Sequence, residues 1–198
     1  MAEPDRQSYY DVLYQEIGLL ERLIQDLTDL NVLRNEKYPL RQEEINVMDV
    51  LKDAIRSQRL IAREKNITLV EEFAGEACYI LGDYARIRQM FVIVLNNAIK
   101  YSAAGAEVSV VYDRAASSLS ITNTGEDIGA DSLSRIFEPF YRDRNTKEKG
   151  TGLGLSIAKT IADRQGITIK ASSVGGQTSF CFTMQTVQAD KWGSDPEV

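Results

Sequence analysis

A glycine-rich stretch, GTGLGL at residues 150–155, stands between a very polar segment at 141–149 and an apolar run with helical spacing at 153–162. Glycine lacks a Cβ atom, so at the start of a helix it lets backbone N–H groups approach an anion closely. The arrangement predicts a basic loop that closes over phosphate groups at a helix N-terminus. By itself, this motif does not separate phosphate binding from an ordinary turn.

The sequence excludes two common phosphate-binding motifs. A P-loop requires Gly-Lys followed by Ser or Thr, and no such triplet occurs. The dinucleotide-binding fingerprint is G-x-G-x-x-G directly after a buried strand, whereas the spacing here is G-x-G-x-G after a charged loop. If GTGLGL binds phosphate, it does so in another nucleotide-binding fold.

The composition bounds the class of protein. The 198 residues are 43% hydrophobic and 26% charged, which suits one domain with a buried core plus an extension. The net charge of −6 argues against nucleic acid as a general partner. No apolar run reaches the roughly 18 residues that a membrane-spanning helix needs, and the N-terminus lacks the features of a signal peptide. We expect a soluble, intracellular chain.

The sequence contains two cysteines and no histidine. Cys78 and Cys181 both have apolar or β-forming neighbours, which favours buried side chains over a disulfide or a metal pair. The absence of histidine removes the commonest general base and the commonest metal ligand.

The first expected element is a long amphipathic helix from Gln7 to about Arg34. Its apolar residues alternate spacings of four and three, which is typical of helix-on-helix packing: Leu13, Ile17, Leu20, Ile24 and Leu27. Few other apolar positions remain, so this helix is expected to pack against a partner helix. The alternative is a helix that folds back onto its own domain.

A linker near residues 35–44, with Pro39, separates this helix from the next. The second helix, about 47–65, has a capping-box-like pair in Asn46 and Asp49. Its expected buried face comprises Val47, Val50, Leu51, Ala54, Ile55, Leu60 and Ile61. Two short strands follow, at 68–73 and 77–80, with Gly75 at the turn between them.

The third helix is expected to begin after Asp83 as N-cap and to bury an apolar stripe: Ile87, Met90, Phe91, Val94, Leu95, Ala98 and Ile99. The rest should comprise a strand pair (108–112, 119–122), a short amphipathic helix (Leu133, Ile136, Phe137, Phe140), the glycine-led helix to about Gln165 and a closing hairpin (167–171, 178–184). Paired strands and intervening helices favour an α+β fold, an antiparallel or mixed sheet with helices on one face.

Five stretches, in order, resemble the motifs of sensor histidine kinases. FVIVLNNAIKYS (91–102) resembles the N box, and NTGEDI (123–128) a variant of the first glycine box. IFEPFYR (136–142) is similar to the F box, and GTGLGL to the second glycine box. GGQTSF (175–180) resembles the terminal Gly-x-Thr-x-Phe hairpin.

This resemblance, which runs from about residue 9 to residue 185, implies the two-layer α/β sandwich of histidine kinases, gyrase-type topoisomerases, heat-shock chaperones and MutL, with an N-terminal coiled-coil-like helix. It implies that residues 1–38 are part of a dimerisation and phosphotransfer unit, 39–187 an ATP-binding catalytic domain, and 188–198 a loose tail.

The resemblance also implies ATP and Mg²⁺ as cofactors. Asn97 would offer its side-chain oxygen to Mg²⁺, and Lys100, one helical turn along, would neutralise phosphate charge. Lys100 and Arg142 are the implied catalytic residues. The implied nucleotide-binding residues are Asn97, Lys100, Tyr101, Asn123, Gly125, Ile128, Phe137, Gly150, Thr151, Gly152, Leu153, Gly154, Leu155 and Thr178. Asn96 points about 100° away around the helix and is expected to have no such role.

Three positions depart from the family's pattern. Asn123 stands where the family usually has Asp; its amide oxygen can still accept from the adenine amino group, but it is uncharged and its orientation must be fixed by neighbours. Asp127 replaces the second glycine of this box, which puts the close backbone approach there in doubt. Ile93 stands where hydrolytic relatives carry a Glu, and it cannot act as a general base.

Without that base, phosphoryl transfer to an external acceptor is favoured over rapid ATP hydrolysis. Basic residues of the polar loop are candidates for charge neutralisation, with a solvated charged loop as the alternative: Arg142, Arg144, Lys147 and Lys149. A clamp-type ATPase and a degenerate scaffold that binds no ATP remain as rival functions.

The N-terminal helix resembles the second helix of the family's phosphotransfer hairpin, so the helix with the phosphoacceptor histidine is expected upstream of Met1. Without histidine, this chain cannot autophosphorylate on that residue. The resemblance implies a homodimeric parent, with this part in the cytoplasm whether or not the parent crosses the inner membrane. The parent would pass its phosphoryl group to a response regulator. The oligomeric state of the chain itself stays open.

Overall fold

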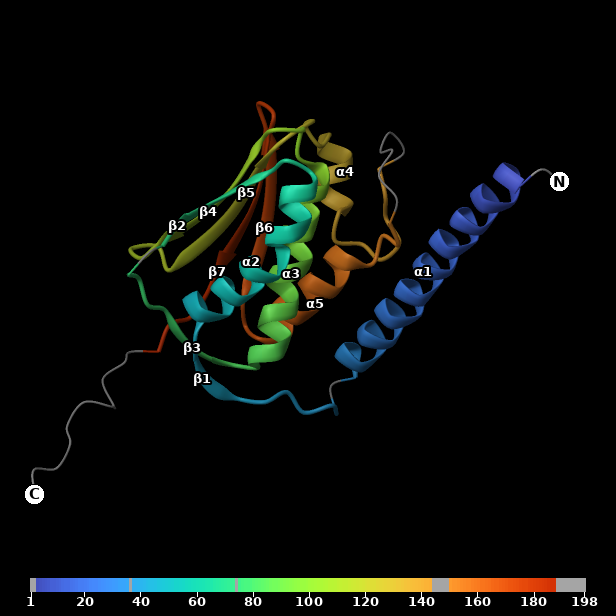
Figure 1. Cartoon of the computed structure of the whole chain (residues 1–198). Coiled ribbons are helices and arrows are strands. Elements are labelled where there is room, and N and C mark those ends of the chain that lie inside the picture. The colour runs from blue at the N-terminus through green and yellow to red at the C-terminus, as the bar shows by residue number, and fades with distance from the viewer. Residues whose placement is uncertain (1–2, 36, 74, 144–149, 188–198) are drawn as a thin grey trace, which may run out of the picture.

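The computed structural model describes residues 3–35, 37–73, 75–143 and 150–187. Helices α2, α3 and α5 form one layer against a five-stranded sheet, and α1 projects from this body toward the N-terminus (Figure 1). The elements in chain order are α1 (Glu3–Arg34), β1 (Glu43–Asn46), α2 (Val47–Glu64), β2 (Thr68–Glu72), β3 (Tyr79–Gly82), α3 (Tyr84–Tyr101), β4 (Glu107–Asp113), β5 (Ser118–Thr124), α4 (Ala130–Arg135), α5 (Gly154–Arg164), β6 (Thr168–Val174) and β7 (Gln177–Thr183).

The large sheet has the strand order β2-β4-β5-β7-β6. Strands β2 and β4 run parallel, and every other neighbouring pair in this sheet is antiparallel. The expected mixed sheet with helices on one face is therefore confirmed. The core lies between the two layers, where Phe91 of α3 meets Phe182 of β7 edge to face at 5.3 Å between ring centroids.

The third helix follows the prediction in full. The Asp83 carboxylate accepts from the Arg86 N–H at 3.1 Å and caps the helix, and every residue of the predicted apolar stripe is buried. This stripe fixes the face that α3 turns to the sheet. The residues between the stripe positions lie on the other faces of α3. They include the candidate site residues Asn97 and Lys100.

Two expectations for the segment around α2 are wrong. Residues 43–44, expected at the end of a linker, belong instead to β1, which pairs antiparallel with β3; β2 and β3 do not pair with each other. Leu60 is 67% exposed and Ile61 also lies at the surface, whereas Gln58 and Ala62 are buried. Spacings of three and four from the start of α2 lead to these last two positions, so Leu60 and Ile61 lie off the buried face.

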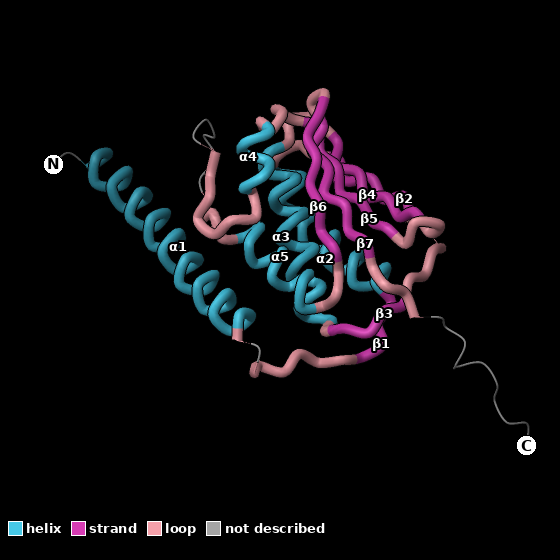
Figure 2. Tube along the Cα trace, turned by 180° about the vertical axis from the view of Figure 1, so that it is seen from behind, coloured by secondary structure: helices cyan, strands magenta, loops and turns pink. Residues whose placement is uncertain are grey.

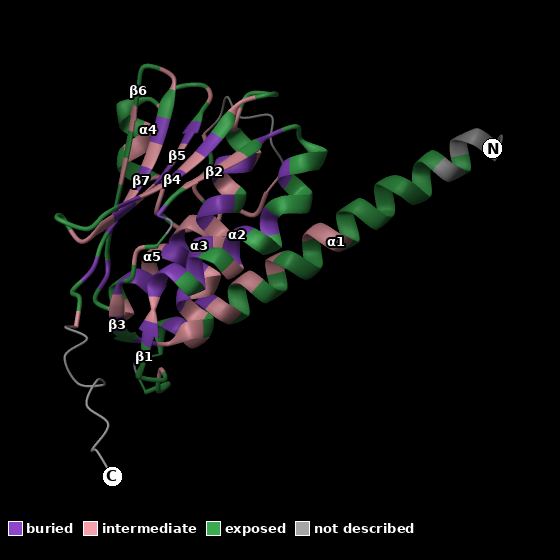
Figure 3. Ribbon diagram, turned by 60° about the vertical axis from the view of Figure 1, so that its left-hand side comes forward, coloured by how far each residue is buried: buried purple, intermediate pink, exposed green. Residues whose placement is uncertain are grey.

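The C-terminal end of helix α1 packs against the body. Leu30 and Leu33 are buried, and Arg164 of α5 donates hydrogen bonds to the carbonyl oxygens of Leu33 (3.2 Å) and Tyr38 (2.7 Å). The residues of the predicted apolar seam are exposed. Figure 3 colours most of α1 as exposed, and Figure 2 shows from behind that the N-terminal part of α1 stands away from the sheet. The helix therefore docks on its own body at one end, and the predicted partner for its seam stays a prediction.

Both cysteines are free, so no disulfide joins them. Cys78 is buried and Cys181 is half-buried. Burial raises the pKa of the Cys78 thiol, so this side chain stays protonated. No helix in the described ranges has the length and hydropathy needed to cross a bilayer.

Candidate functional site

One face of α3 lies against the glycine-rich stretch. A Cβ atom built on Gly154 would lie 3.3 Å from Ile93 Cγ2, and one built on Gly150 would lie 3.0 Å from Lys100 Nζ. Asn97 stands between Ile93 and Lys100 on the helix, at spacings of four and three. The fold therefore brings together the N box and the second glycine box, whose centres are more than fifty positions apart in the sequence.

The two neighbouring asparagines of α3 behave differently. Asn97 is half-buried, and its side chain makes no hydrogen bond to another described residue. Asn96 is exposed and donates to Gln58 Oε1 of α2 at 3.3 Å. Asn97 therefore has an amide available to a ligand on the side of the glycine-rich stretch, whereas Asn96 connects two helices.

The start of α5 is open to an anion. Leu153 is the N-cap residue, and its apolar side chain makes no capping hydrogen bond to the first N–H groups of the helix. Such groups carry the positive end of the helix dipole. Lys100 Nζ lies at the entry to this stretch and also 5.0 Å from the centroid of the half-exposed Tyr101 ring. A helix N-terminus and an ammonium group therefore lie at opposite ends of the same short loop.

Gly152 occupies a position that only glycine fits well. Its φ is +74°, and a Cβ atom there would lie 2.9 Å from the Phe140 carbonyl carbon. The Phe140 N–H donates to the Gly152 carbonyl oxygen at 2.9 Å. The backbones on the two sides of the predicted basic loop are thereby fastened together. Arg142 is exposed within the described residues, whereas Arg144, Lys147 and Lys149 lie outside them.

The opposite end of the candidate site is built on the sheet. Asn123 of β5 and Thr178 of β7 are direct partners across the strand pair, 3% and 5% exposed. The Thr178 hydroxyl lies 2.9 Å from the Ser173 hydroxyl. The Asn123 side chain makes no hydrogen bond to any described residue, and its amide atoms are not among the enclosed unsatisfied atoms of the described residues, which are Glu76 Oε2 and Gln165 Nε2.

Gly125 lets two backbones approach each other beside Asn123. A Cβ atom on Gly125 would lie 2.3 Å from the Tyr101 carbonyl oxygen at the end of α3. The Gly125 N–H donates to the Gly176 carbonyl oxygen in the β6–β7 turn at 2.9 Å. This glycine therefore joins the end of α3, the first glycine box and the terminal hairpin.

Asp127 has a defined place in this end of the site. Its Oδ1 accepts from the Gly176 N–H at 2.8 Å and lies 3.5 Å from the Ser173 hydroxyl. Ser173 in turn accepts from the Ile128 N–H at 2.9 Å. Where the family has a second glycine, this chain thus has a carboxylate that ties the loop after β5 to the β6–β7 hairpin.

The F box lies mostly in turns, because α4 ends at Arg135 and the predicted amphipathic helix does not continue through Ile136 and Phe140. Phe137 is half-buried and meets Phe180 of β7 edge to face at 6.4 Å. A hydrogen bond with Glu138 raises the pKa of the Arg135 guanidinium, which stays charged. The aromatic ring of Phe137 therefore packs against the sheet near the end of the site that contains Asn123 and Thr178.

Helix α1 contributes a contact that the sequence reasoning missed. The Thr151 hydroxyl, inside GTGLGL, donates to Asp26 Oδ2 of α1 at 2.7 Å and accepts from the Leu153 N–H at 3.3 Å. Asp29, one turn along, receives Arg86 (3.4 Å) and Gln89 (2.9 Å) of α3. The sequence feature that could have predicted these contacts is the pair of acidic residues, spaced by three, on a face of α1 away from its apolar seam.

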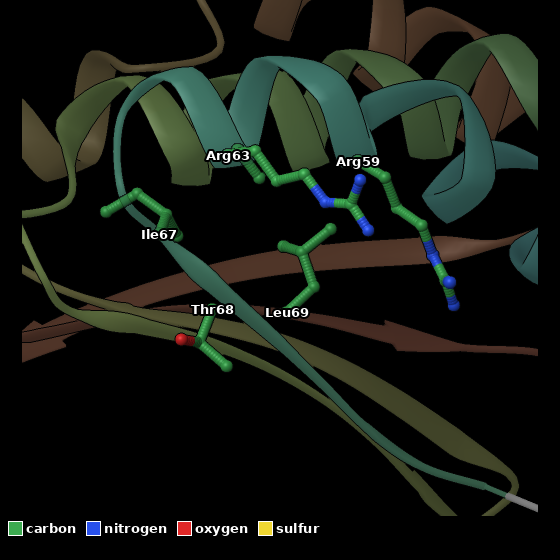
Figure 4. A pocket seen from close by; sticks show the side chains of 6 residues that line it. Arg59, Arg63, Ile67, Thr68 and Leu69 are labelled. Atoms are coloured by element: carbon green, nitrogen blue, oxygen red, sulfur yellow. The ribbon is translucent and has the colours of Figure 1, made fainter.

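A separate hollow of about 290 Å³ lies between α2 and β2 (Figure 4). Arg59 and Arg63 of α2 extend over Leu69 of β2 there, and Arg59 pairs with Glu71 at 2.8 Å. Its lining contains none of the predicted site residues: Arg59, Ala62, Arg63, Ile67, Thr68 and Leu69. The motif residues, not this hollow, define the candidate site. No group of three His, Cys, Asp or Glu side chains suited to a metal occurs among the described residues.

Known proteins resemble the chain along most of its length. Sensor histidine kinase YkoH of Bacillus subtilis is 36% identical over 145 residues, which cover 72% of this chain and 32% of that protein. Drug sensory protein A of Synechocystis sp. is 30% identical over 205 residues, 96% of this chain and 31% of that protein. The chain thus spans about a third of the length of these relatives.

Solved structures show the same fold. The histidine kinase ThkA, solved in complex with the response regulator protein TrrA, has a TM-score of 0.73 and 20% identity, over 92% of this chain and 52% of that chain. The expected α/β sandwich is thereby confirmed. Residues 82–188 match the family model described as histidine kinase-, DNA gyrase B- and HSP90-like ATPase. That segment includes the N box, both glycine boxes and the terminal hairpin, and the chain therefore belongs to this ATPase family.

Proposed function

We propose that the chain is the ATP-binding catalytic part of a two-component sensor histidine kinase and that it binds ATP together with Mg²⁺. The buried Asn123 side chain carries this proposal, because it has no hydrogen-bond partner among the described residues. Asn123 lies near the end of the central strand β5, and its amide atoms are not among the enclosed atoms without a partner, so a ligand can reach them and supply the missing partner. The adenine amino group is such a partner.

The two ends of the site suit the two ends of ATP. Asn123 and Thr178 would meet the base, whereas Lys100 and the open N-terminus of α5 would meet the phosphates. Mg²⁺, when bound, would neutralise phosphate charge. Asn97 fits as its protein ligand because its half-buried amide has no described partner and lies between Ile93 and Lys100.

The proposed reaction is phosphoryl transfer to an external acceptor. Ile93 packs against Gly154 where a water-activating carboxylate would be needed for hydrolysis, and its side chain cannot take a proton. The remaining residues can position and neutralise phosphates, which is most of what such a transfer requires. Lys100 and Arg142 are the proposed catalytic residues.

The whole protein would complete the reaction. We propose that residues 1–38 belong to a dimerisation unit and that a histidine on an upstream helix of the homodimeric parent receives the γ-phosphoryl group. A response regulator would then accept it, a class of partner that the ThkA–TrrA complex supports. The exposed seam of α1 supports a helical partner.

Calorimetric titration of Mg-ATP into this chain tests the binding proposal. We expect saturable binding that weakens when EDTA removes the metal, because Mg²⁺ neutralises phosphate charge. Asn97→Ala should abolish most of this metal dependence, whereas Asn96→Ala, one position away and bonded to Gln58, should leave it intact. No binding at millimolar nucleotide would overturn the function; equal behaviour of the two variants would remove Asn97 as the ligand.

Phosphorylation tests the catalytic proposal. A longer protein, in which a histidine-bearing helix precedes this chain, should become labelled from γ-labelled ATP, whereas its Lys100→Met variant should be labelled slowly. An unlabelled protein that still binds ATP would show that the chain is a nucleotide-binding module without kinase activity.

A further inference from the structure

We propose that this site also accepts 6-oxopurine nucleoside triphosphates, the class that includes inosine and guanine nucleotides, with an affinity comparable to that for ATP. The proposal rests on the proposed function, because it assigns the base specificity of the same site. It depends on Asn123, whose buried amide can present either an acceptor or a donor to the base.

The chemistry of the base edge makes this residue type decisive. Adenine carries an amino group at position 6, which donates, whereas 6-oxopurines carry a carbonyl there, which accepts. An ionised carboxylate only accepts, so at this position it would favour the amino group and repel the carbonyl oxygen. An amide turned by 180° exchanges Oδ1 for Nδ2 and can match either base.

An amide discriminates between the two bases only if its neighbours fix its orientation, and here they do not. The Thr178 hydroxyl, on the adjacent strand, is engaged with Ser173 at 2.9 Å. The Gly125 N–H is engaged with the Gly176 carbonyl oxygen at 2.9 Å. No described residue hydrogen-bonds to the Asn123 side chain, so either orientation is available without breaking a protein hydrogen bond.

The nearby carboxylate does not replace the missing one. Asp127 lies four residues further along the chain, in the loop after β5, but its Oδ1 accepts from the Gly176 N–H at 2.8 Å and lies near Ser173. Turning this carboxylate toward the base would release the β6–β7 turn. Asn123 is therefore the residue that sets the donor and acceptor pattern offered to position 6.

Displacement of a fluorescent ATP analogue by ATP and by inosine triphosphate, both with Mg²⁺, tests the proposal. Inosine triphosphate isolates the effect of the 6-oxo group, because it lacks the 2-amino group of guanine. For the unmodified chain we expect the two dissociation constants to agree within about tenfold. Asn123→Asp, which keeps the shape of the side chain, should weaken inosine triphosphate about 10- to 100-fold relative to ATP.

The outcomes separate this inference from the proposed function. If neither nucleotide displaces the analogue and calorimetry finds no ATP binding, the proposed function fails. If ATP binds to the unmodified chain and inosine triphosphate is more than about a hundredfold weaker, only the present inference fails. The unmodified chain decides this even if the variant does not fold. If Asn123→Asp leaves the ratio of the two dissociation constants unchanged, the present inference is also overturned.

Discussion

The base end and the phosphate end of the site are built in different ways. At the base end, buried strand residues and backbone hydrogen bonds hold Asn123 and Gly125 against the β6–β7 hairpin. At the phosphate end, groups from three helices meet at GTGLGL: Lys100 of α3, the start of α5 and Asp26 of α1. The base end therefore depends on the integrity of the sheet, whereas the phosphate end depends on how the helices are placed.

The largest effect is expected at the base end, from Gly125→Ala. The added methyl group would lie 2.3 Å from the Tyr101 carbonyl oxygen, a backbone atom that cannot rotate away. We expect the free energy of unfolding to fall by about 3 kcal/mol, with loss of ATP binding, measured by urea denaturation and calorimetry. Gly129→Ala is the matched control, because nothing lies within 4 Å of its added methyl group. Similar losses in both variants would contradict the backbone contact.

At the phosphate end, Lys100→Met should reduce ATP affinity. The variant removes the ammonium group beside Gly150 and keeps an unbranched apolar chain. We expect a loss of about 10- to 100-fold in affinity, measured by calorimetry and smaller at high salt. Lys159→Met, which removes the exposed partner of Asp163, should leave the affinity unchanged. A loss caused by both variants would indicate general electrostatic attraction instead of a phosphate contact.

Asp127→Gly, which restores the family's glycine, sharpens the account of the base end. The variant removes the acceptor for the Gly176 N–H, so the free energy of unfolding should fall by about 1 kcal/mol. Asp127→Asn keeps an oxygen acceptor at that place, so its free energy of unfolding should fall by less. Urea denaturation of both variants decides the point: equal losses would show that the charge matters and the hydrogen bond does not.

The smallest effect is expected from Asp26→Asn at the phosphate end. This carboxylate accepts from Thr151 within the glycine-rich stretch and forms no ion pair with another described residue. Its negative charge would oppose phosphate, so neutralising it should tighten ATP binding about threefold at low salt. Asp29→Asn, next to Arg86, should lower stability and leave the affinity unchanged. Weaker ATP binding by Asp26→Asn would contradict the repulsion.

Predictions from the sequence were most accurate where the spacing of apolar residues repeats along a short segment. The stripe of α3 and the closing hairpin were predicted because spacings of three and four, and of two, repeat over several residues. Strand β1 was missed because only Ile45 of its four residues is buried, which leaves no alternation. Leu60 and Ile61 were misplaced because hydrophobicity was weighed above their angle around α2.

The candidate site divides in the same way. The motif residues were named from short local patterns, and the fold brings Lys100, Asn97 and GTGLGL together. The bond between Asp26 and Thr151 joins residues 125 positions apart, and no local pattern encodes it. The engagement of Asp127 with Gly176 depends likewise on the β6–β7 turn reaching the loop after β5.

The hydrogen bond between Thr151 and Asp26 makes α1 and the glycine-rich stretch parts of one thermodynamic cycle. A ligand that competes for the Thr151 hydroxyl must weaken the attachment of α1, and attached α1 must weaken that ligand by the same free energy. If the proposed nucleotide competes for this hydroxyl, detaching α1 should change the nucleotide affinity. Helix α1, which projects from the body, is thus also bonded directly to the glycine-rich stretch at the phosphate end of the proposed site.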